Sequence, residues 1–337
     1  MIKYEQRLSV RIDSCFCNPL NFFLDWVREL YQKQSNDFTK FDSVKMQDVN
    51  HFDFLFFRGQ PNSTYKLTPS LFRTEKIRNK DVYKYKDNER LMILDYLEVA
   101  PAHTFDYSLL EDIERALVEM QHHEIPTRLL DWTYAPLTAL FFACQGDVDA
   151  DGAVFCMDAW GAYHEWKRSI ENRKGIKVPT IYLEIGIQAR CLVAMGWKNN
   201  EIMEWIYKRY NYMITPEEYE FPLPFYPQYR NRRVFAQRGV FTIWGKTDKY
   251  SLEDFSEYEK YIHKFVIDKE FKERILKDLE MLFINDYNQY PDLLGVSKLM
   301  KKNGGLFFLS RCEFDRRNGG EKSSENAVSG NSSSETA

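Results

Sequence analysis

The stretch that decides the fold is residues 119–146, EMQHHEIPTRLLDWTYAPLTALFFACQG, in which polar side chains stand between apolar runs. Residues 128–130 predict a short strand and residues 131–133 a turn. Pro136 suits the first turn of a helix, because N–H groups there lack intrahelical acceptors, and the helix is expected to reach Gly146. Thr133 is expected to cap this helix through its hydroxyl. Such a strand–turn–helix unit suits an anion or a nucleotide, or is a rigid core unit whose polar groups satisfy one another.

Apolar spacing predicts the other elements. Repeats of three and four residues predict helices over residues 20–31, 89–100, 109–122, 199–212, 269–285 and 293–302. Shorter apolar runs bounded by glycine or proline predict strands over residues 52–60, 152–157, 178–185 and the two halves of 231–245 on either side of Gly239. A further short strand is expected near the N-terminus. The segments 64–73 and 221–229 are expected to be loops, because each contains proline in a turn-forming context.

These elements predict an α+β fold with central, mostly antiparallel small sheets, packed helices, and helical N- and C-terminal flanks. We expect an N-terminal helical flank over residues 1–50 and the main α+β domain over 51–302, with an insertion at about 160–222. The remaining segment, 303–337, contains Ser, Asn, Gly and Glu in abundance and is expected to be disordered from about residue 318.

Composition narrows the class of protein. The net charge is −4 and the pI is about 6.0, so the chain lacks the global positive field that drives nonspecific nucleic-acid binding. The six cysteines show no CxxC spacing, which favours a reducing, cytoplasmic setting and predicts no metal site, although Cys15 and Cys17 could in principle be ligands. No apolar run is long enough to be a signal peptide core or a membrane span, so a soluble protein without membrane contact is expected.

Three polar clusters stand at predicted strand ends. They are residues 58–60, residues 128–133 with His122 and His123 before them, and residues 237–239. We expect them to converge in one cleft. Gly59 and Gly239 allow a ligand or another backbone to approach closely. An arginine beside a glycine suits a phosphate, because the guanidinium bonds two oxygens at once, whereas the alternative for Arg58 is a buried structural pair with Asp131.

The histidine pair offers a general acid or base near neutral pH. Adjacent side chains point in different directions, so at most one of the two is expected to face the cleft, and we name His123 as the candidate. The chain contains no GxSxG, P-loop, HExxH or GxGxxG motif. Common hydrolases, zinc proteases, P-loop enzymes and dinucleotide dehydrogenases are therefore disfavoured.

The chain resembles the bacterial FRG domain family, which takes its name from the tripeptide Phe57-Arg58-Gly59. The other segments that carry the resemblance are residues 68–73 (TPSLFR), 121–133 (QHHEIPTRLLDWT), 136–143 (PLTALFFA) and 237–241 (QRGVF). The resemblance spans roughly residues 25–302. The resemblance implies a shared fold and says little about activity, because this family is defined by sequence.

A remoter resemblance is to ADP-ribosyltransferases, which implies a split sheet around NAD. Arg58 would take the first place of that pattern, Thr133 or its neighbours Asp131 and Trp132 the second, and Gln237 the third. A neutral amide at residue 237 cannot stabilise an oxocarbenium-like charge as a carboxylate does, so Asp131 or Glu124 would supply that charge.

We therefore predict an NAD-like nucleotide cleft, with NAD as co-substrate, in an ADP-ribosyltransferase, an NAD glycohydrolase or another NAD-consuming toxin or phage-defence effector. The candidate catalytic residues are Arg58, Thr133, Gln237, Asp131 and His123. The candidate cofactor-binding residues are Arg58, Gly59, Gln60, Arg128, Trp132 and Thr133. The acceptor is expected to be a protein or a nucleic acid. The alternative is a noncatalytic module that binds nucleic acid or a nucleotide through the aromatic loop 221–229 and the basic residues Arg230, Arg232 and Arg233.

Overall fold

The computed structural model describes residues 4–8, 18–38, 54–78, 80–104, 112–179, 181–227 and 232–302. The chain divides into two compact units, Met1–Asn285 and Asp286–Ala337. The first unit contains every described strand. Each unit is described by itself below.

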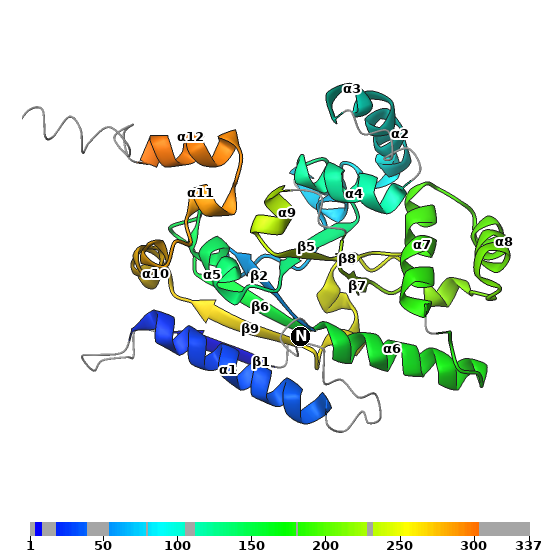
Figure 1. Cartoon of the computed structure of the whole chain (residues 1–337), viewed down its shortest axis with the longest axis horizontal. Helices are drawn as coiled ribbons and strands as arrows, with labels where there is room; N and C mark the ends of the chain where they lie inside the picture. Colours follow the sequence, from blue (N-terminus) through cyan, green and yellow to red (C-terminus); the bar gives the residue numbers. More distant parts are fainter. Residues whose placement is uncertain are drawn as a thin grey trace, which may run out of the picture. The chain divides into compact units, whose positions relative to one another are not determined.

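The first unit is built on a seven-stranded sheet in the order β1-β9-β6-β2-β5-β8-β7 (Figure 1). β1 and β9 are parallel, and the other neighbouring strands are antiparallel. A separate hairpin is formed by β3 and β4. The strands are β1 (Tyr4–Leu8), β2 (Leu55–Gln60), β3 (Thr74–Ile77), β4 (Lys80–Tyr83), β5 (Leu129–Thr133), β6 (Gly152–Asp158), β7 (Leu223–Phe225), β8 (Gly239–Ile243) and β9 (Ile262–Ile267).

The sheet has a weak point between β2 and β5. These two strands are in register at a single pair, Phe57 with Thr133, whereas β2 pairs with β6 along its whole length and β5 pairs with β8 along its whole length. The ladder therefore divides the sheet into a four-stranded part, β1-β9-β6-β2, and a three-stranded part, β5-β8-β7. This division positions the candidate site.

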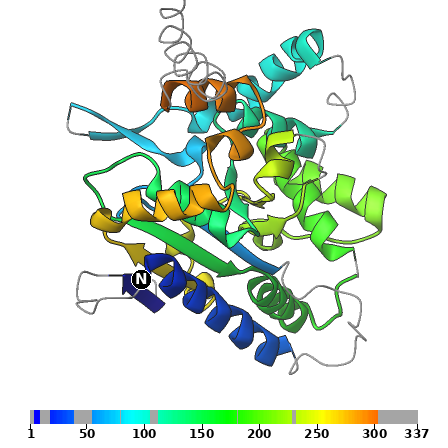
Figure 2. The ribbon, with the colours of Figure 1, turned by 60° about the vertical axis from the view of Figure 1, so that its left-hand side comes forward.

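Helices α1 (Pro19–Phe38), α5 (Pro136–Cys144) and α10 (Lys269–Met281) pack on one face of the four-stranded part (Figures 1 and 2). Alternate residues of β2 face in opposite directions, as the twofold period of a strand requires. Leu55 and Phe57 lie in the cluster formed with these helices, while Phe56 lies in a second cluster on the opposite face with Phe155. By the same alternation, Arg58 faces the side of the sheet opposite to Phe57.

A third apolar cluster joins the three-stranded part to helices that come mostly from the middle of the chain. These helices are α2 (Glu89–Val99), α4 (Ile113–His122), α6 (Ala159–Lys174), α7 (Tyr182–Ala194) and α8 (Asn199–Tyr210). Two shorter helices complete the unit: α3 (Pro101–Thr104) and α9 (Arg232–Ala236). The 3-10 helices are η2 (Ser70–Phe72), η3 (Lys86–Asn88), η5 (Pro216–Glu218), η6 (Leu252–Asp254) and η7 (Ser256–Tyr258). Residues 68–73, one of the segments that carry the resemblance to FRG domains, contain η2 and directly precede the hairpin of β3 and β4.

The described part of the second unit consists of α11 (Asp286–Gln289) and α12 (Leu293–Lys302). Lys298 connects the two helices, because its ammonium group lies 3.9 Å from the carboxylate of Asp286 and over the ring of Tyr290. The expected disordered segment from residue 318 lies outside the described residues, as do Cys15 and Cys17.

Much of the expected element order is confirmed. The mixed, mostly antiparallel architecture is as predicted, and so are the helices α1, α2, α4, α5, α8, α10 and α12 and the strands β1, β2 and β6. The described strands do not form several small sheets, since seven of them share one sheet. β1 and α1 belong to that sheet and its apolar cluster, so the N-terminal segment is part of the main unit.

Five predictions of local structure were wrong. Residues 131–133 continue the strand β5, so the predicted turn does not occur there. The segment 178–185 runs into the helix α7, and the first half of 231–245 forms the short helix α9. The N-cap of α5 is Ala135, so Thr133 does not cap this helix directly, although Pro136 occupies its first turn as predicted. The segment 221–229, expected to be a loop, contains β7, and strand β9 was not predicted.

Candidate functional site

A cleft of about 620 Å³ opens where the ladder between β2 and β5 stops. Its volume lies in the range of small-molecule sites, about 300 to 1,000 Å³. The lining residues come from β2, η2, the end of α4, β5, the end of α5 and α9. They are Arg58, Gly59, Pro61, Ser70, Arg73, Gln121, Glu124, Ile125, Asp131, Trp132, Thr133, Phe142, Gln145, Gly146, Arg233 and Gln237. The three predicted polar clusters thus meet in one place.

Arg58 connects the two parts of the sheet at the point where they separate. Its Nη1 donates a hydrogen bond of 2.7 Å to the backbone carbonyl of Asp131, and lies 3.6 Å from the carboxylate of the same residue. Only 15% of the Arg58 side chain is exposed, and its Nε is buried with no hydrogen-bond partner in the described part of the chain. The pKa of the guanidinium is lowered to about 10. Burial is the main cause, Asp131 raises the pKa, and the positive charge of Arg73 lowers it. The group remains a cation at neutral pH.

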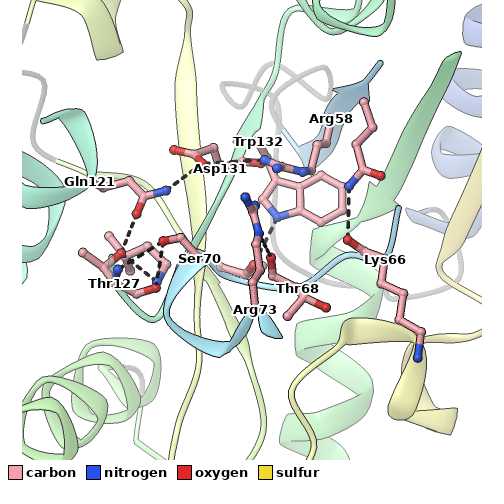
Figure 3. A network of polar contacts seen from close by, with 12 residues as sticks. Arg58, Lys66, Thr68, Ser70, Arg73, Gln121, Thr127, Asp131 and Trp132 are labelled. Carbon is pink, nitrogen blue, oxygen red and sulfur yellow. Dashed lines mark hydrogen bonds and ion pairs between the residues drawn. The ribbon is translucent and has the colours of Figure 1, made fainter. Parts of the chain in front are cut away.

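A chain of side-chain hydrogen bonds holds Asp131 in place (Figure 3). Gln121 at the end of α4 donates from Nε2 to the Asp131 carboxylate at 2.7 Å and accepts at Oε1 from the hydroxyl of Thr127 at 2.5 Å. The backbone N–H of Thr127 donates to the hydroxyl of Ser70 in η2. Because the amide of Gln121 is fixed at both ends, the network orients the acidic partner of Arg58.

Thr133 and Gln237 meet at the opposite side of the cleft. The hydroxyl of Thr133 donates to the backbone carbonyl of Gln237 at 2.7 Å and accepts from the N–H of Ala135 at 2.9 Å. Since its donor is already used, Thr133 joins the start of α5 to the residues before β8, and its predicted role in cofactor binding gains no support from this geometry. The residue Gln237 lines the cleft.

Gly59 is required by the packing of β2 against α5. A Cβ at residue 59 would lie 1.9 Å from the carbonyl oxygen of Ala139. The close approach that we expected at this glycine is therefore made by another backbone. Trp132 also serves the core, because it is 3% exposed and its indole N–H donates to Thr242, so the stacking face predicted for it is largely covered by protein.

Three predicted site residues do not line the cleft. Arg128 is buried against Glu89, which it contacts from Nε at 2.8 Å and from Nη2, and its Nη1 donates to the carbonyls of Trp244 and Gly245. Gln60 is buried and donates to the carbonyl of Lys66 at 3.4 Å. His123 is exposed at the C-terminal end of α4, against the ring of His122. We assign Arg128 and Gln60 structural roles.

Two arginines of the cleft, Arg73 and Arg233, are absent from the predicted NAD site, and Arg233 was named only for the alternative nucleic-acid module. Arg73 ends the segment TPSLFR, which carries part of the family resemblance, and Arg233 lies in α9, which was expected to be strand. The motif at residues 68–73 was the available signal for Arg73. Glu124, considered above as a source of negative charge, lines the cleft with a φ of 61°. This left-handed conformation is unusual for glutamate.

The surface of the alternative nucleic-acid module is only partly described, since residues 228–231 lie outside the described residues. Within the loop, Leu223 to Phe225 form a buried strand, and Phe221 packs against Phe255 and Tyr258. Tyr226 is 42% exposed and contacts Phe56 edge to face. Two of the rings that were expected to stack on bases, Phe221 and Phe225, therefore pack within the protein.

Metal ligands and membrane spans were also sought in the described ranges. They contain no group of three or more His, Cys, Asp or Glu side chains placed to hold a metal ion. Cys144, Cys156 and Cys191 are buried free thiols. No helix in the described part of the chain combines the length and hydropathy that a membrane span requires.

The fold and the cleft define a mixed α/β protein with a candidate ligand site between two parts of its sheet. Residues 53–152 match the family model of the FRG domain, so the chain contains an FRG domain over these residues. The match runs from β2 to the start of β6 and includes Arg58, Arg73 and Asp131 but not Gln237. No curated protein and no solved structure matches the chain significantly.

Proposed function

We propose that the cleft between β2 and β5 binds NAD or a similar nucleotide that contains a diphosphate. In this proposal the protein either transfers ADP-ribose from NAD to an acceptor or hydrolyses NAD. The observation that carries this proposal is Arg58, a buried cation that lines the cleft and whose Nε has no hydrogen-bond partner in the part of the chain that the structure describes. A buried charged donor without a partner is costly, and an oxyanion would satisfy it.

The divided sheet supports the same proposal. The resemblance to ADP-ribosyltransferases implies a ligand between two parts of a split sheet, and the cleft lies where the ladder between β2 and β5 stops. In the proposed reaction, the bond between the nicotinamide nitrogen and the ribose carbon breaks, and nicotinamide leaves with the bonding electrons. Water or an acceptor nucleophile then forms the new bond to that carbon and loses a proton.

The residues available for this chemistry are few. Gln237 and the carboxylates of Asp131 and Glu124 line the cleft with Arg58. Asp131 already accepts from Gln121 and pairs with Arg58, which leaves Glu124 as a second candidate for stabilising positive charge on the ribose. An enzyme that consumes NAD in this way would serve as a toxin or a phage-defence effector.

The test is incubation of the purified protein with labelled NAD, alone and in a lysate that contains protein and nucleic acid. We expect nicotinamide release or label transfer by the wild-type protein and none by Arg58→Ala. Arg58→Lys is the matched variant, since it keeps the charge and removes the planar fork. Gln237→Glu is expected to increase the rate, because a carboxylate stabilises the transition state better than an amide.

Thermal unfolding of each variant distinguishes loss of binding from loss of structure. Absence of NAD chemistry in the wild-type protein and in Gln237→Glu, with all variants folded, would contradict the proposal. Binding of an oligonucleotide that weakens steeply with salt would then favour the alternative nucleic-acid module.

A further inference from the structure

Two arginines of the cleft are anchored in the same manner, each through one nitrogen to a backbone carbonyl. Arg58 donates from Nη1 to the carbonyl of Asp131 at 2.7 Å, and Arg73 donates from Nε to the carbonyl of Thr68 at 3.2 Å (Figure 3). Both side chains line the cleft, although one comes from β2 and the other from the residue that follows η2. Such anchoring fixes the direction of a long side chain before any ligand arrives.

The anchor of Arg58 leaves a defined edge of its guanidinium. A guanidinium carries five N–H donors, and Nε and Nη2 together form an edge that can face two oxygens of one anion. Nη1 is used by Asp131, while Nε is buried without a hydrogen-bond partner among the described residues. In Arg73, the nitrogen that is anchored is Nε, so the hydrogen bond to Thr68 does not use the N–H groups of Nη1 and Nη2.

The described residues that line the cleft include more arginines than carboxylates. The positive charge of Arg73 acts on Arg58, and a third arginine, Arg233, also lines the cleft. Against them stand Asp131, whose side chain is 51% exposed and is shared with Gln121, and Glu124. An excess of positive charge in a cleft favours an anion of more than one negative charge.

We propose that Arg58 and Arg73 form a two-point oxyanion site that takes the diphosphate of a nucleotide, with Arg58 binding through its Nε–Nη2 edge. A diphosphate presents oxygens on two phosphorus atoms, so two guanidinium groups from separate segments can each contact it. A single carboxylate offers oxygens to only one fork. This inference rests on the proposed function for the ligand class, but it does not depend on the reaction, and it assigns Arg73 a role in ligand binding.

The test is calorimetric titration of the full chain with inorganic pyrophosphate, and separately with ADP and with adenosine. We expect the wild-type protein to bind pyrophosphate and ADP, and to bind adenosine much more weakly. Arg73→Gln should weaken pyrophosphate binding by at least about tenfold, because it removes a charged bidentate donor. Arg73→Lys should lie between the two. Arg28→Gln is the matched control, since Arg28 is an exposed arginine of α1 that does not line the cleft.

Arg73 is exposed, so its variants are expected to remain folded even if those of the buried Arg58 do not. Unchanged pyrophosphate binding by Arg73→Gln, or no binding by the wild-type protein, would overturn the oxyanion site. Pyrophosphate binding that needs Arg73 without any NAD consumption would contradict the proposed reaction and keep the site. NAD consumption that is unaffected by Arg73→Gln would keep the reaction and overturn the site.

Discussion

At the scale of single residues, two arginines in similar sequence settings have different hydrogen-bond partners. Arg58 and Arg128 both stand at the ends of short apolar runs, and each is mostly buried. Arg128 has its donors taken by Glu89 and two carbonyls, whereas the Nε of Arg58 has no hydrogen-bond partner among the described residues. A buried donor without a partner costs free energy, and this difference is the basis for proposing an oxyanion ligand at Arg58.

The backbone of Glu124 provides a first test at this scale. Its φ of 61° places it in the left-handed region, which costs a residue with a Cβ about 1 kcal/mol relative to glycine. We expect Glu124→Gly to raise the free energy of unfolding by up to about 1 kcal/mol, as measured by urea denaturation. Glu124→Ala removes the same carboxylate and keeps the strain, so it should not be stabilised. Equal effects of the two substitutions would show that the backbone is not strained here.

His263 of β9 predicts a pH dependence of stability. Burial, with a smaller effect of the positive charge of Lys33, lowers its pKa to about 4. A histidine in an unfolded chain has a pKa of about 6.5, so the unfolded state binds the proton first and stability is lost as the pH falls from about 6.5 towards 4. The expected loss from this residue between pH 7 and pH 5 is about 2 kcal/mol.

Denaturation of the wild-type protein and His263→Gln at both pH values measures this contribution. The variant has no titratable group at residue 263, so its loss of stability between pH 7 and pH 5 should be smaller. Equal losses in the two proteins would mean that the histidine is protonated equally in the folded and unfolded states.

At the scale of elements, the packing of α5 on β2 stabilises the part of the fold that surrounds the cleft. Phe57 enters the apolar cluster beneath α5, and Gly59 lets the helix backbone approach the strand. The helix α7 illustrates where periodicity fails, because it is buried on nearly all sides and its sequence lacks the polar face that identifies an amphipathic helix. The run that precedes it, from Val178, therefore suggested a strand.

Gly59→Ala tests the contact between β2 and α5. The added Cβ would lie 1.9 Å from the carbonyl of Ala139, so the strand and the helix must move apart. We expect a loss of about 3 kcal/mol or more in the free energy of unfolding, measured by urea denaturation, or failure to fold. Gly175→Ala is the control: no atom lies within 4 Å of the added group, although its φ of 66° is unfavourable for alanine, whereas the φ of Gly59 lies outside the left-handed region. A loss for Gly59→Ala no larger than that for Gly175→Ala would contradict a packing cost at residue 59.

At the scale of the whole molecule, the sheet and its three apolar clusters belong to the first unit. All buried members of these clusters precede Asn285, where that unit ends. β9, which comes late in the sequence of this unit, lies between β1 and β6 in the sheet. The strand order thus joins segments from both ends of the unit into one cooperative structure.

We expect a chain that ends at Asn285 to fold, because it retains the whole sheet and all the buried residues of the clusters. Circular dichroism and urea denaturation should give one cooperative transition, as for a single compact unit. A chain that ends before β9, at Gly245, is the comparison and should fail to fold. Loss of cooperative unfolding in the longer variant would mean that the second unit is needed for the stability of the first.

The sequence by itself determined the local elements with strong periodicity and the residue types of the cleft. The spacing of apolar residues identified α1, α5 and α10, and the clusters at residues 58–60, 128–133 and 237–239 were expected to converge. Local spacing suffices for these features, because the period of buried residues follows directly from helix and strand geometry.

Only the tertiary structure decided which polar residues line the cleft and which partners they have. The division of the sheet between β2 and β5, the pairing of Arg128 with Glu89 and the approach of Arg73 to Arg58 all depend on contacts between segments far apart in the sequence. Hydrogen bonds and charges act through space at short range, so the partner of each group is set when distant segments meet. For the same reason, the roles of Thr133 and Gly59 became clear only from their contacts with Gln237 and Ala139.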